Sequence, residues 1–226
     1  IKQIQIDRDT MTPITVLGVL GNNSRMRTSQ ICLSHGFGDG GAQSCQFTED
    51  AVSNLLLGVD IDFYVAMNLD GISVLNDWAG GVTVTLQDDF SQIDPSMTPG
   101  TVMTLVGDQA EIFVRTRHGI GVGTNESRME RQELYINQLA AQLDEKLTAN
   151  QDAAGELYDV LSPYLITDMS RGRLINEVWA ARSYAREPVI EIAGEYQIGS
   201  DGFMEFIADE DSIKQIVLDL FYVPVK

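Results

Sequence analysis

Patterns typical of helices and of strands alternate along this chain, and the alternation restricts its fold more than any other feature. A helix is expected at 49–57, where a capping threonine precedes the acidic first turn and a glycine follows the last apolar residue. Residues 62–67 and 82–86 are rich in β-branched and aromatic side chains and indicate strands, with a short helical pattern at 72–78 between them. This order predicts an α/β fold of three layers, α/β/α, with helices on both faces of a mixed central sheet.

The longest helical pattern covers 126–147, and further helices are expected at 153–164, at 170–184 and after a cap near Asp209. Two stripes on the long helix keep the three, four and seven spacing of one helix face. The apolar stripe is Met129, Ile136, Leu139, Leu143 and Leu147, and the second stripe is Arg128, Arg131, Gln132 and Tyr135. No repeat or long linker divides the sequence, so residues 1–226 are expected to form a single domain.

The charge of the chain argues against nucleic acid as a partner. Asp and Glu total 33 against 15 Lys and Arg, a formal net charge of -18, and a polyanion of this kind repels phosphate backbones. Eleven of the fifteen cations are Arg, which favours planar, bidentate recognition of anions. After a long stretch without any cation, four of them follow within seventeen residues: Arg115, Arg117, Arg128 and Arg131.

This arginine cluster has two interpretations. The residues can pair with the abundant carboxylates, as surface arginines commonly do. Alternatively they form a pocket for a phosphate-bearing ligand, because two forks one residue apart (Arg115 and Arg117) can hold a pyrophosphate and the start of a helix also attracts anions. Phosphoryl transfer depends mainly on positioning and on neutralising charge, so the second interpretation suits a phosphotransferase.

Several motifs, taken in order, make the chain similar to the LytR-CpsA-Psr family of bacterial cell-wall assembly. Residues 6–11 (Ile-Asp-Arg-Asp-Thr-Met) resemble the family's Pro-Arg-Asp-Thr segment, and Trp78-Ala79-Gly80-Gly81-Val82 resembles its Gly-Gly-Val turn. Val114-Arg115-Thr116-Arg117 resembles its Arg-x-Arg motif, and Arg128-Met129-Glu130-Arg131-Gln132 resembles its Arg-x-x-Arg-Gln helix start. The resemblance spans essentially the whole chain.

The resemblance implies an extracytoplasmic, membrane-anchored phosphotransferase of the bacterial cell envelope. Enzymes of this family move a glycopolymer of teichoic acid or capsule type from an undecaprenyl-pyrophosphate carrier to peptidoglycan, with Mg²⁺ on the pyrophosphate. The polyprenyl tail would then lie in an apolar tunnel between the sheet and the helices, to which the long helix would contribute. Two alternatives remain open: a non-catalytic binder of polyprenyl pyrophosphate or wall polymer, and a polyprenyl-pyrophosphate hydrolase.

Carried over by position, the resemblance also assigns the site residues. Arg8, Arg115 and Arg117 would hold the pyrophosphate and act in catalysis. Asp9 would accept a proton or orient Arg8. Toward the head-group end, the resemblance implies a lining formed by Arg128, Arg131 and Gln132.

Three departures from the family pattern accompany these assignments. Asp7 stands where the family usually has proline, and Asn125 stands where an aspartate commonly precedes the helix start. The family's metal ligands come from a strand before the Arg-Asp-Thr segment, so the expected ligands would lie upstream of Ile1, together with a first strand and a membrane anchor. The metal ligands of this chain are therefore left unassigned.

The chain has two cysteines, Cys32 and Cys45, with twelve residues between them. An even pair in a protein that works outside the membrane can form a disulfide. The alternative is two free or buried thiols.

Overall fold

The computed structural model describes residues 1–18, 21, 24–116, 119–120 and 125–222. Its contacts divide the chain into two compact units. Unit 1 comprises Ile1–Ala66, Ile166–Ser170 and Ser183–Lys226, and unit 2 comprises Met67–Leu165 and Arg171–Arg182. Each unit has its own hydrophobic cluster. That residues 1–226 form a single family domain stays a prediction.

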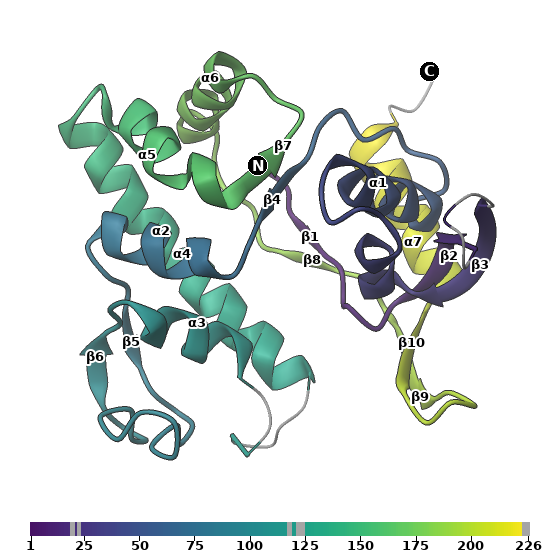
Figure 1. The fold of residues 1–226 in the computed structure, drawn as a ribbon, viewed down its shortest axis with the longest axis horizontal. Helices are drawn as coiled ribbons and strands as arrows, with labels where there is room; N and C mark the ends of the chain where they lie inside the picture. Colours follow the sequence, from purple (N-terminus) through teal and green to yellow (C-terminus); the bar gives the residue numbers. More distant parts are fainter. Residues whose placement is uncertain (19–20, 22–23, 117–118, 121–124, 223–226) are drawn as a thin grey trace. The chain divides into compact units, whose positions relative to one another are not determined.

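Unit 1 combines short strand pairs with two helices. The parallel pair is β1 (Ile4–Gln5) with β8 (Ile190–Glu191), and the antiparallel pairs are β2 (Met11–Leu17) with β3 (Ser24–Gln30) and β9 (Gly194–Ile198) with β10 (Met204–Ala208). Two short 3₁₀ helices, Ile31–Leu33 and His35–Phe37, precede α1 (Ala42–Leu55), and α7 (Glu210–Phe221) follows β10. Helix α1 packs against β2 (Figure 1).

The core of unit 1 follows from the alternation along β2. Ile14 and Val16 are buried on one face of that strand and meet Ala51 and Leu55 of α1. Helix α7 adds Ile213 and Val217 to the same cluster. Its predicted cap is confirmed, because the Asp209 carboxylate accepts the backbone N–H of Ser212 at 2.8 Å.

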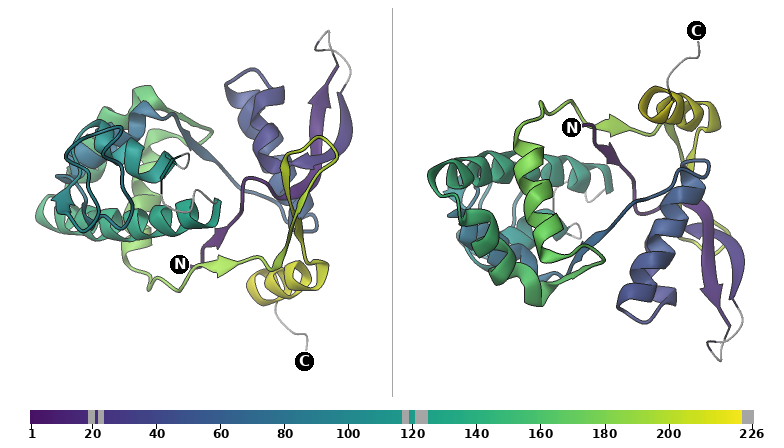
Figure 2. Two further views of the ribbon diagram at one scale, coloured as in Figure 1. Left: turned by 90° about the horizontal axis from the view of Figure 1, so that it is seen from below. Right: turned by 90° about the horizontal axis from the view of Figure 1, so that it is seen from above.

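Unit 2 is mostly helical, with one antiparallel strand pair (Figures 1 and 2). Its elements are α2 (Asp70–Ala79), β5 (Thr83–Thr85), β6 (Val102–Thr104), α3 (Asp108–Arg115), α4 (Asn125–Ala149), α5 (Ala153–Leu161), a 3₁₀ turn (Ser162–Tyr164) and α6 (Arg171–Arg182). Phe90, Phe113 and Leu105 are at the centre of its core. Strands β4 (Val65–Met67) and β7 (Leu165–Thr167) pair where the chain passes between the units.

The α/β class is confirmed, and the arrangement of strands is simpler than expected. In place of one mixed central sheet, the described strands form five two-stranded pairs. The helix expected at 49–57 begins earlier, at Ala42. Asp39 precedes it, and its carboxylate accepts the N–H of Gly41 and that of Ser44 in the first turn. Thr48 is therefore an interior residue of α1 and donates its hydroxyl to the Ser44 carbonyl.

The long helix α4 is confirmed, and its buried face includes more residues than the expected apolar stripe. Leu139 and Leu147 of the expected apolar stripe are buried and Leu143 packs against the core, whereas Ile136 of that stripe is 42% exposed. Two members of the second stripe, Arg131 and Tyr135, are buried on the same side of the helix.

Among the helices of the described residues, none combines the length and the apolar composition that crossing a membrane requires.

Candidate functional site

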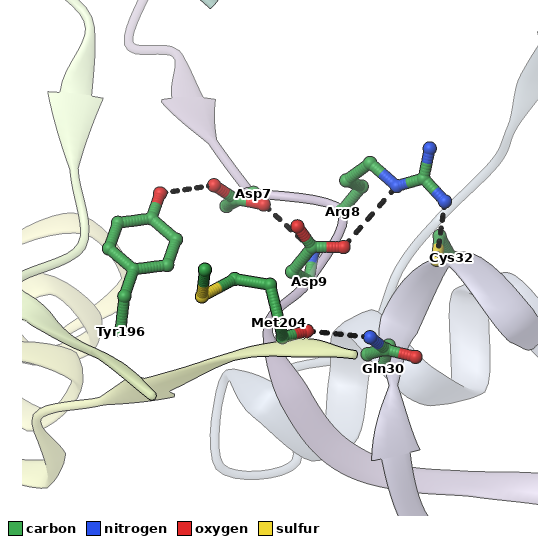
Figure 3. A network of polar contacts seen from close by, with 7 residues as sticks. All are labelled: Asp7, Arg8, Asp9, Gln30, Cys32, Tyr196 and Met204. Carbon is green, nitrogen blue, oxygen red and sulfur yellow. Dashed lines mark hydrogen bonds and ion pairs between the residues drawn. The ribbon is translucent and has the colours of Figure 1, made fainter. Parts of the chain in front are cut away.

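The first candidate locus is the tight turn at Asp7, Arg8 and Asp9 in unit 1. Asp7 is buried, and its carboxylate accepts the backbone N–H of Asp9 at 2.7 Å and the hydroxyl of Tyr196 from β9 (Figure 3). Its carbonyl accepts the N–H of Thr10 at 3.1 Å. At the position where the family usually has proline, Asp7 thus shapes the turn with its side chain.

Backbone hydrogen bonds hold the same turn from two sides. The N–H of Cys32 donates to the Arg8 carbonyl at 3.1 Å, and the N–H of Phe206 donates to the Asp9 carbonyl at 2.8 Å. A side-chain bond from Gln30 to the Met204 carbonyl lies beside them (Figure 3). The backbone that carries Arg8 is therefore fixed by the 3₁₀ helix that follows β3 and by β10.

Arg8 projects from this rigid turn with its side chain 47% exposed. Its Nε lies 3.4 Å from a carboxylate oxygen of Asp9, and one terminal nitrogen lies 3.6 Å from the Cys32 sulfur (Figure 3). Burial lowers the pKa of Arg8, but Cys32 and then the two carboxylates outweigh it and raise the pKa overall. Asp9, 6% exposed, is placed to orient Arg8, which is one of its two expected roles.

The two cysteines of unit 1 have different surroundings. Cys32 faces Arg8, and Cys45 is buried on α1. Both are free thiols, so the disulfide considered for the pair is not formed in this structure. Burial, followed by the charge of Glu49, raises the pKa of the Cys45 thiol, which keeps it protonated near neutral pH.

Cys45 and Glu49 line a cavity of about 280 Å³ in unit 1. Val52 of α1, Tyr64 and His35 also contribute to its wall. The long helix α4, which was expected to contribute to the lipid tunnel, belongs to unit 2 and does not line this cavity. The tunnel stays a prediction.

The second candidate locus is the end of α3 in unit 2, where the Arg-x-Arg motif begins. Arg115 ends the helix as expected, with its side chain 62% exposed, and donates to the Glu111 carboxylate at 2.8 Å. An exposed ion pair of this kind contributes about 0–1 kcal/mol, so a phosphate could replace Glu111 as the partner of the guanidinium at little cost in free energy. Arg117 lies outside the described residues.

Arg131 is buried beneath this helix end, 8% exposed, and all of its described contacts are within unit 2. Its Nε donates to the Phe113 carbonyl at 3.1 Å, and one terminal nitrogen donates to the Thr116 carbonyl. The other terminal nitrogen lies 2.7 Å from a carboxylate oxygen of Asp88. The guanidinium also lies 5.5 Å from the centre of the Phe90 ring.

Gln132 continues the same contact by donating to the Val114 carbonyl at 2.9 Å. Two residues of the Arg-x-x-Arg-Gln motif therefore bind the last carbonyls of α3, which have no partner within the helix. The structure brings the start of the Arg-x-Arg motif and this motif together, and Arg131 and Gln132 donate to protein carbonyls there. Their expected contact with a head group stays a prediction. Arg128, partly buried on the first turns of α4, retains its expected assignment as a prediction.

Asp88 is the residue that sequence reasoning missed. The pair Asp88-Asp89 resembles a solvated acidic turn, and nothing in its spacing indicates a partner 43 residues later. The one available signal was Arg131 itself, because it lies on a helix face that must be buried and a buried guanidinium requires a carboxylate.

The described residues do not build a magnesium site. They contain no group of three or more His, Cys, Asp or Glu side chains placed to share an ion. The carboxylates of Asp7 and Asp9 already bind Tyr196 and Arg8. Magnesium therefore stays a prediction from the family resemblance, and the residues present do not hold it by themselves.

Comparison with known proteins gives one consistent family. A family model described as the LytR_cpsA_psr family matches residues 1–220. The chain is 29% identical over 200 residues to the polyisoprenyl-teichoic acid–peptidoglycan teichoic acid transferase TagU of Halalkalibacterium halodurans, a match that covers 86% of this chain and 59% of that protein. It is 31% identical over 140 residues to the cell wall biosynthesis protein LcpA of Corynebacterium glutamicum, covering 61% of this chain and 25% of that protein.

A solved structure supports the fold. The crystal structure of B. subtilis TagV matches with a TM-score of 0.69 at 20% identity and covers 99% of this chain and 84% of that chain. The chain spans about three fifths or less of the length of the two curated relatives described above.

Proposed function

Because the chain belongs to the LytR-CpsA-Psr family, we propose that it transfers an anionic glycopolymer, of teichoic acid or capsule type, from an undecaprenyl-pyrophosphate carrier to peptidoglycan. The names of the relatives support transfer over mere binding or hydrolysis, since TagU is named as a polyisoprenyl-teichoic acid–peptidoglycan teichoic acid transferase. The site of action would be the extracytoplasmic face of the membrane, with a membrane anchor outside this chain.

The observation that carries the proposal is the junction of α3 and α4. Residues Arg131 and Gln132 fix the carbonyl end of α3, and Arg115 projects from that end, largely exposed. A guanidinium held on a rigid support is suited to bind phosphate oxygens bidentately. Arg8 shows the same combination in unit 1: a fixed backbone, an orienting carboxylate and a half-exposed guanidinium.

In the proposed reaction, a muramic acid hydroxyl attacks the phosphorus that carries the polymer. A new P–O bond forms to the sugar, the bridging P–O bond of the pyrophosphate breaks, and lipid monophosphate leaves with the bridging oxygen. The hydroxyl proton passes to a base or to solvent. The arginines neutralise the charge that develops on the phosphoryl oxygens and on the leaving phosphate.

Calorimetry with a short polyprenyl pyrophosphate tests the binding half of this proposal. We expect the wild-type chain to bind farnesyl pyrophosphate and Arg115→Ala to bind about tenfold more weakly or worse, because hydrogen bonds to charged groups contribute roughly 1.5–3 kcal/mol. Arg8→Ala and Arg117→Ala are expected to weaken binding similarly. Titrations with Mg²⁺ and with EDTA show whether the ion strengthens binding.

Arg171→Ala is the matched control. Arg171 is an exposed arginine of unit 2 that pairs with Asp159 at 3.0 Å and takes no part in the α3–α4 junction. Its loss removes the same charge and should leave farnesyl pyrophosphate affinity within about twofold. Equal affinity of the wild-type chain and of the Arg8, Arg115 and Arg117 variants would refute the assignment.

A further inference from the structure

We propose that Asp88 is a positioning residue for pyrophosphate binding, acting through the buried guanidinium of Arg131 on the Arg115–Thr116 segment. The inference deepens the proposed function and rests on it for its ligand. It adds a residue that the family motifs do not include, and it changes the role of Arg131 from a ligand-binding group to a clamp.

All three guanidinium nitrogens of Arg131 donate to groups within unit 2. Nε and one terminal nitrogen bind the carbonyls of Phe113 and Thr116, and the other terminal nitrogen binds Asp88. Each of the three guanidinium nitrogens therefore already has a partner. A pyrophosphate that bound Arg131 would have to displace contacts made at 8% exposure.

Arg131, the proposed clamp, holds the carbonyl end of α3. The carbonyls at the end of a helix are unsatisfied within the helix, and an uncapped end frays. Arg131 and Gln132 satisfy the carbonyls of Phe113, Val114 and Thr116, which flank Arg115 on both sides. The orientation of Arg115 therefore depends on whether the Arg131 guanidinium stays in place.

Asp88 and Phe90 in turn hold Arg131 in place. Its carboxylate partner, Asp88, lies in the segment after β5, with its side chain 20% exposed. Neighbouring Phe90 is fully buried and places its ring beside the same guanidinium. A buried guanidinium without a carboxylate is costly, so loss of the Asp88 charge should loosen Arg131 and, with it, the end of α3.

Asp88→Asn tests the proposal, because a gain or a loss of affinity for farnesyl pyrophosphate distinguishes direct ligand binding by Arg131 from a positioning role. Removing a negative charge near an anion site should by itself strengthen anion binding. If Arg131 contacted the pyrophosphate directly, Asp88→Asn would also release its guanidinium and strengthen binding further. The positioning role predicts the opposite sign: a loss of affinity for farnesyl pyrophosphate of about fivefold, as expected for a weakened charged hydrogen bond.

Asp89→Asn is the matched control. Asp89 carries the same charge one residue further along the chain, is exposed, and accepts the Ser91 N–H at 2.9 Å without contacting Arg131. Its substitution should leave affinity unchanged or slightly higher. Arg131→Lys keeps the positive charge but cannot serve three partners, so it should weaken binding about tenfold or more.

Calorimetry would be run well below the melting temperature of each variant, with folding checked by circular dichroism. Unchanged or increased affinity in Asp88→Asn would overturn the positioning role, whatever happens to stability. A loss confined to Asp88→Asn and Arg131→Lys, with Asp89→Asn like the wild type, would support it.

Amide hydrogen exchange separates this proposal from the proposed function, because it needs no ligand. Asp88→Asn should accelerate exchange several-fold at residues 113–116 and leave α5 unchanged. If the wild-type chain bound no farnesyl pyrophosphate, the proposed function would fail, and exchange would still decide whether Asp88 controls the end of α3. Unaltered exchange at 113–116 would refute the clamp.

Discussion

Asn76, at the centre of unit 2, offers a sharp test of how this half of the molecule is held together. The residue is fully buried on α2. Its amide nitrogen donates to the Leu105 carbonyl at 2.8 Å, and its oxygen accepts the Val82 N–H at 3.1 Å and the Tyr135 hydroxyl at 3.2 Å. One side chain thus joins α2, the segments at β5 and β6, and α4.

The cost of Asn76→Ala follows from the groups it leaves behind. Val82, Leu105 and Tyr135 are all buried, so water cannot readily replace the lost partner. Leaving a buried polar group unsatisfied costs about 1–3 kcal/mol, and the lower part of that range for three groups gives a loss of about 4 kcal/mol. For a chain of this size that corresponds to a fall in melting temperature of about 10 °C.

Tryptophan fluorescence during urea unfolding measures this loss selectively. Both tryptophans, Trp78 and Trp179, belong to unit 2 and pack against the cluster formed by Leu147, Ala153 and Ala154. The free energy of unfolding from this probe therefore reports on the unit that contains Asn76. A loss below about 1 kcal/mol would refute the view that its hydrogen bonds hold the unit together.

Two further substitutions complete the measurement. Asn176→Ala makes the same truncation at an exposed position of α6 and should change the free energy of unfolding by no more than about 0.5 kcal/mol. Asn76→Asp keeps the shape of the side chain but buries a carboxyl opposite the Leu105 carbonyl. Its folded-state pKa would be raised, so the variant should be most stable at acid pH and lose stability as pH rises through that pKa.

Three more predictions concern other parts of the structure. Burial, followed by the charge of Asp168, raises the pKa of Glu49 above its ordinary 4.5, so ionisation of Glu49 opposes folding as pH rises. Glu49→Gln should therefore raise the melting temperature at pH 7 and leave it unchanged at pH 4. Equal shifts at the two pH values would contradict this. Gly81→Ala should cost more than about 2 kcal/mol in urea unfolding, because φ is +85° and an added Cβ would lie 2.5 Å from Thr104. Tyr135→Phe should cost about 1 kcal/mol, since it removes only the hydroxyl that burial holds at a pKa of about 12; a neutral result would mean that this hydrogen bond does not contribute.

Local signals in the sequence predicted those parts of the fold that depend on neighbouring residues. The long helix was expected at 126–147 and runs from Asn125 to Ala149, because apolar spacing over six turns has few competing explanations. The strand β3, by contrast, gave no signal. Its residues are mostly polar and exposed, and it exists because its backbone pairs with β2 across seven residues.

The candidate site shows a similar limit for chemistry. The sequence located Arg115 through an arginine cluster that is unusual in so acidic a chain, and it located Arg8 through the family resemblance. The sequence could not show which guanidinium remains exposed to a ligand, because exposure depends on partners far away in sequence. Arg115 pairs with a residue four positions earlier and stays exposed, whereas Arg131 pairs with Asp88, 43 residues earlier, and is buried.

This difference between the two arginines has a consequence for how the motif works. A phosphate site gains from guanidinium groups whose orientation is set before the ligand arrives, since less entropy is then lost on binding. An exposed arginine at a helix end lacks that restraint unless the end itself is fixed. Arg131 donates to the carbonyls of Phe113 and Thr116, on either side of Arg115, and so fixes this helix end. In the proposed site, an accessible arginine would therefore be combined with a buried one that holds it in place without contacting the ligand.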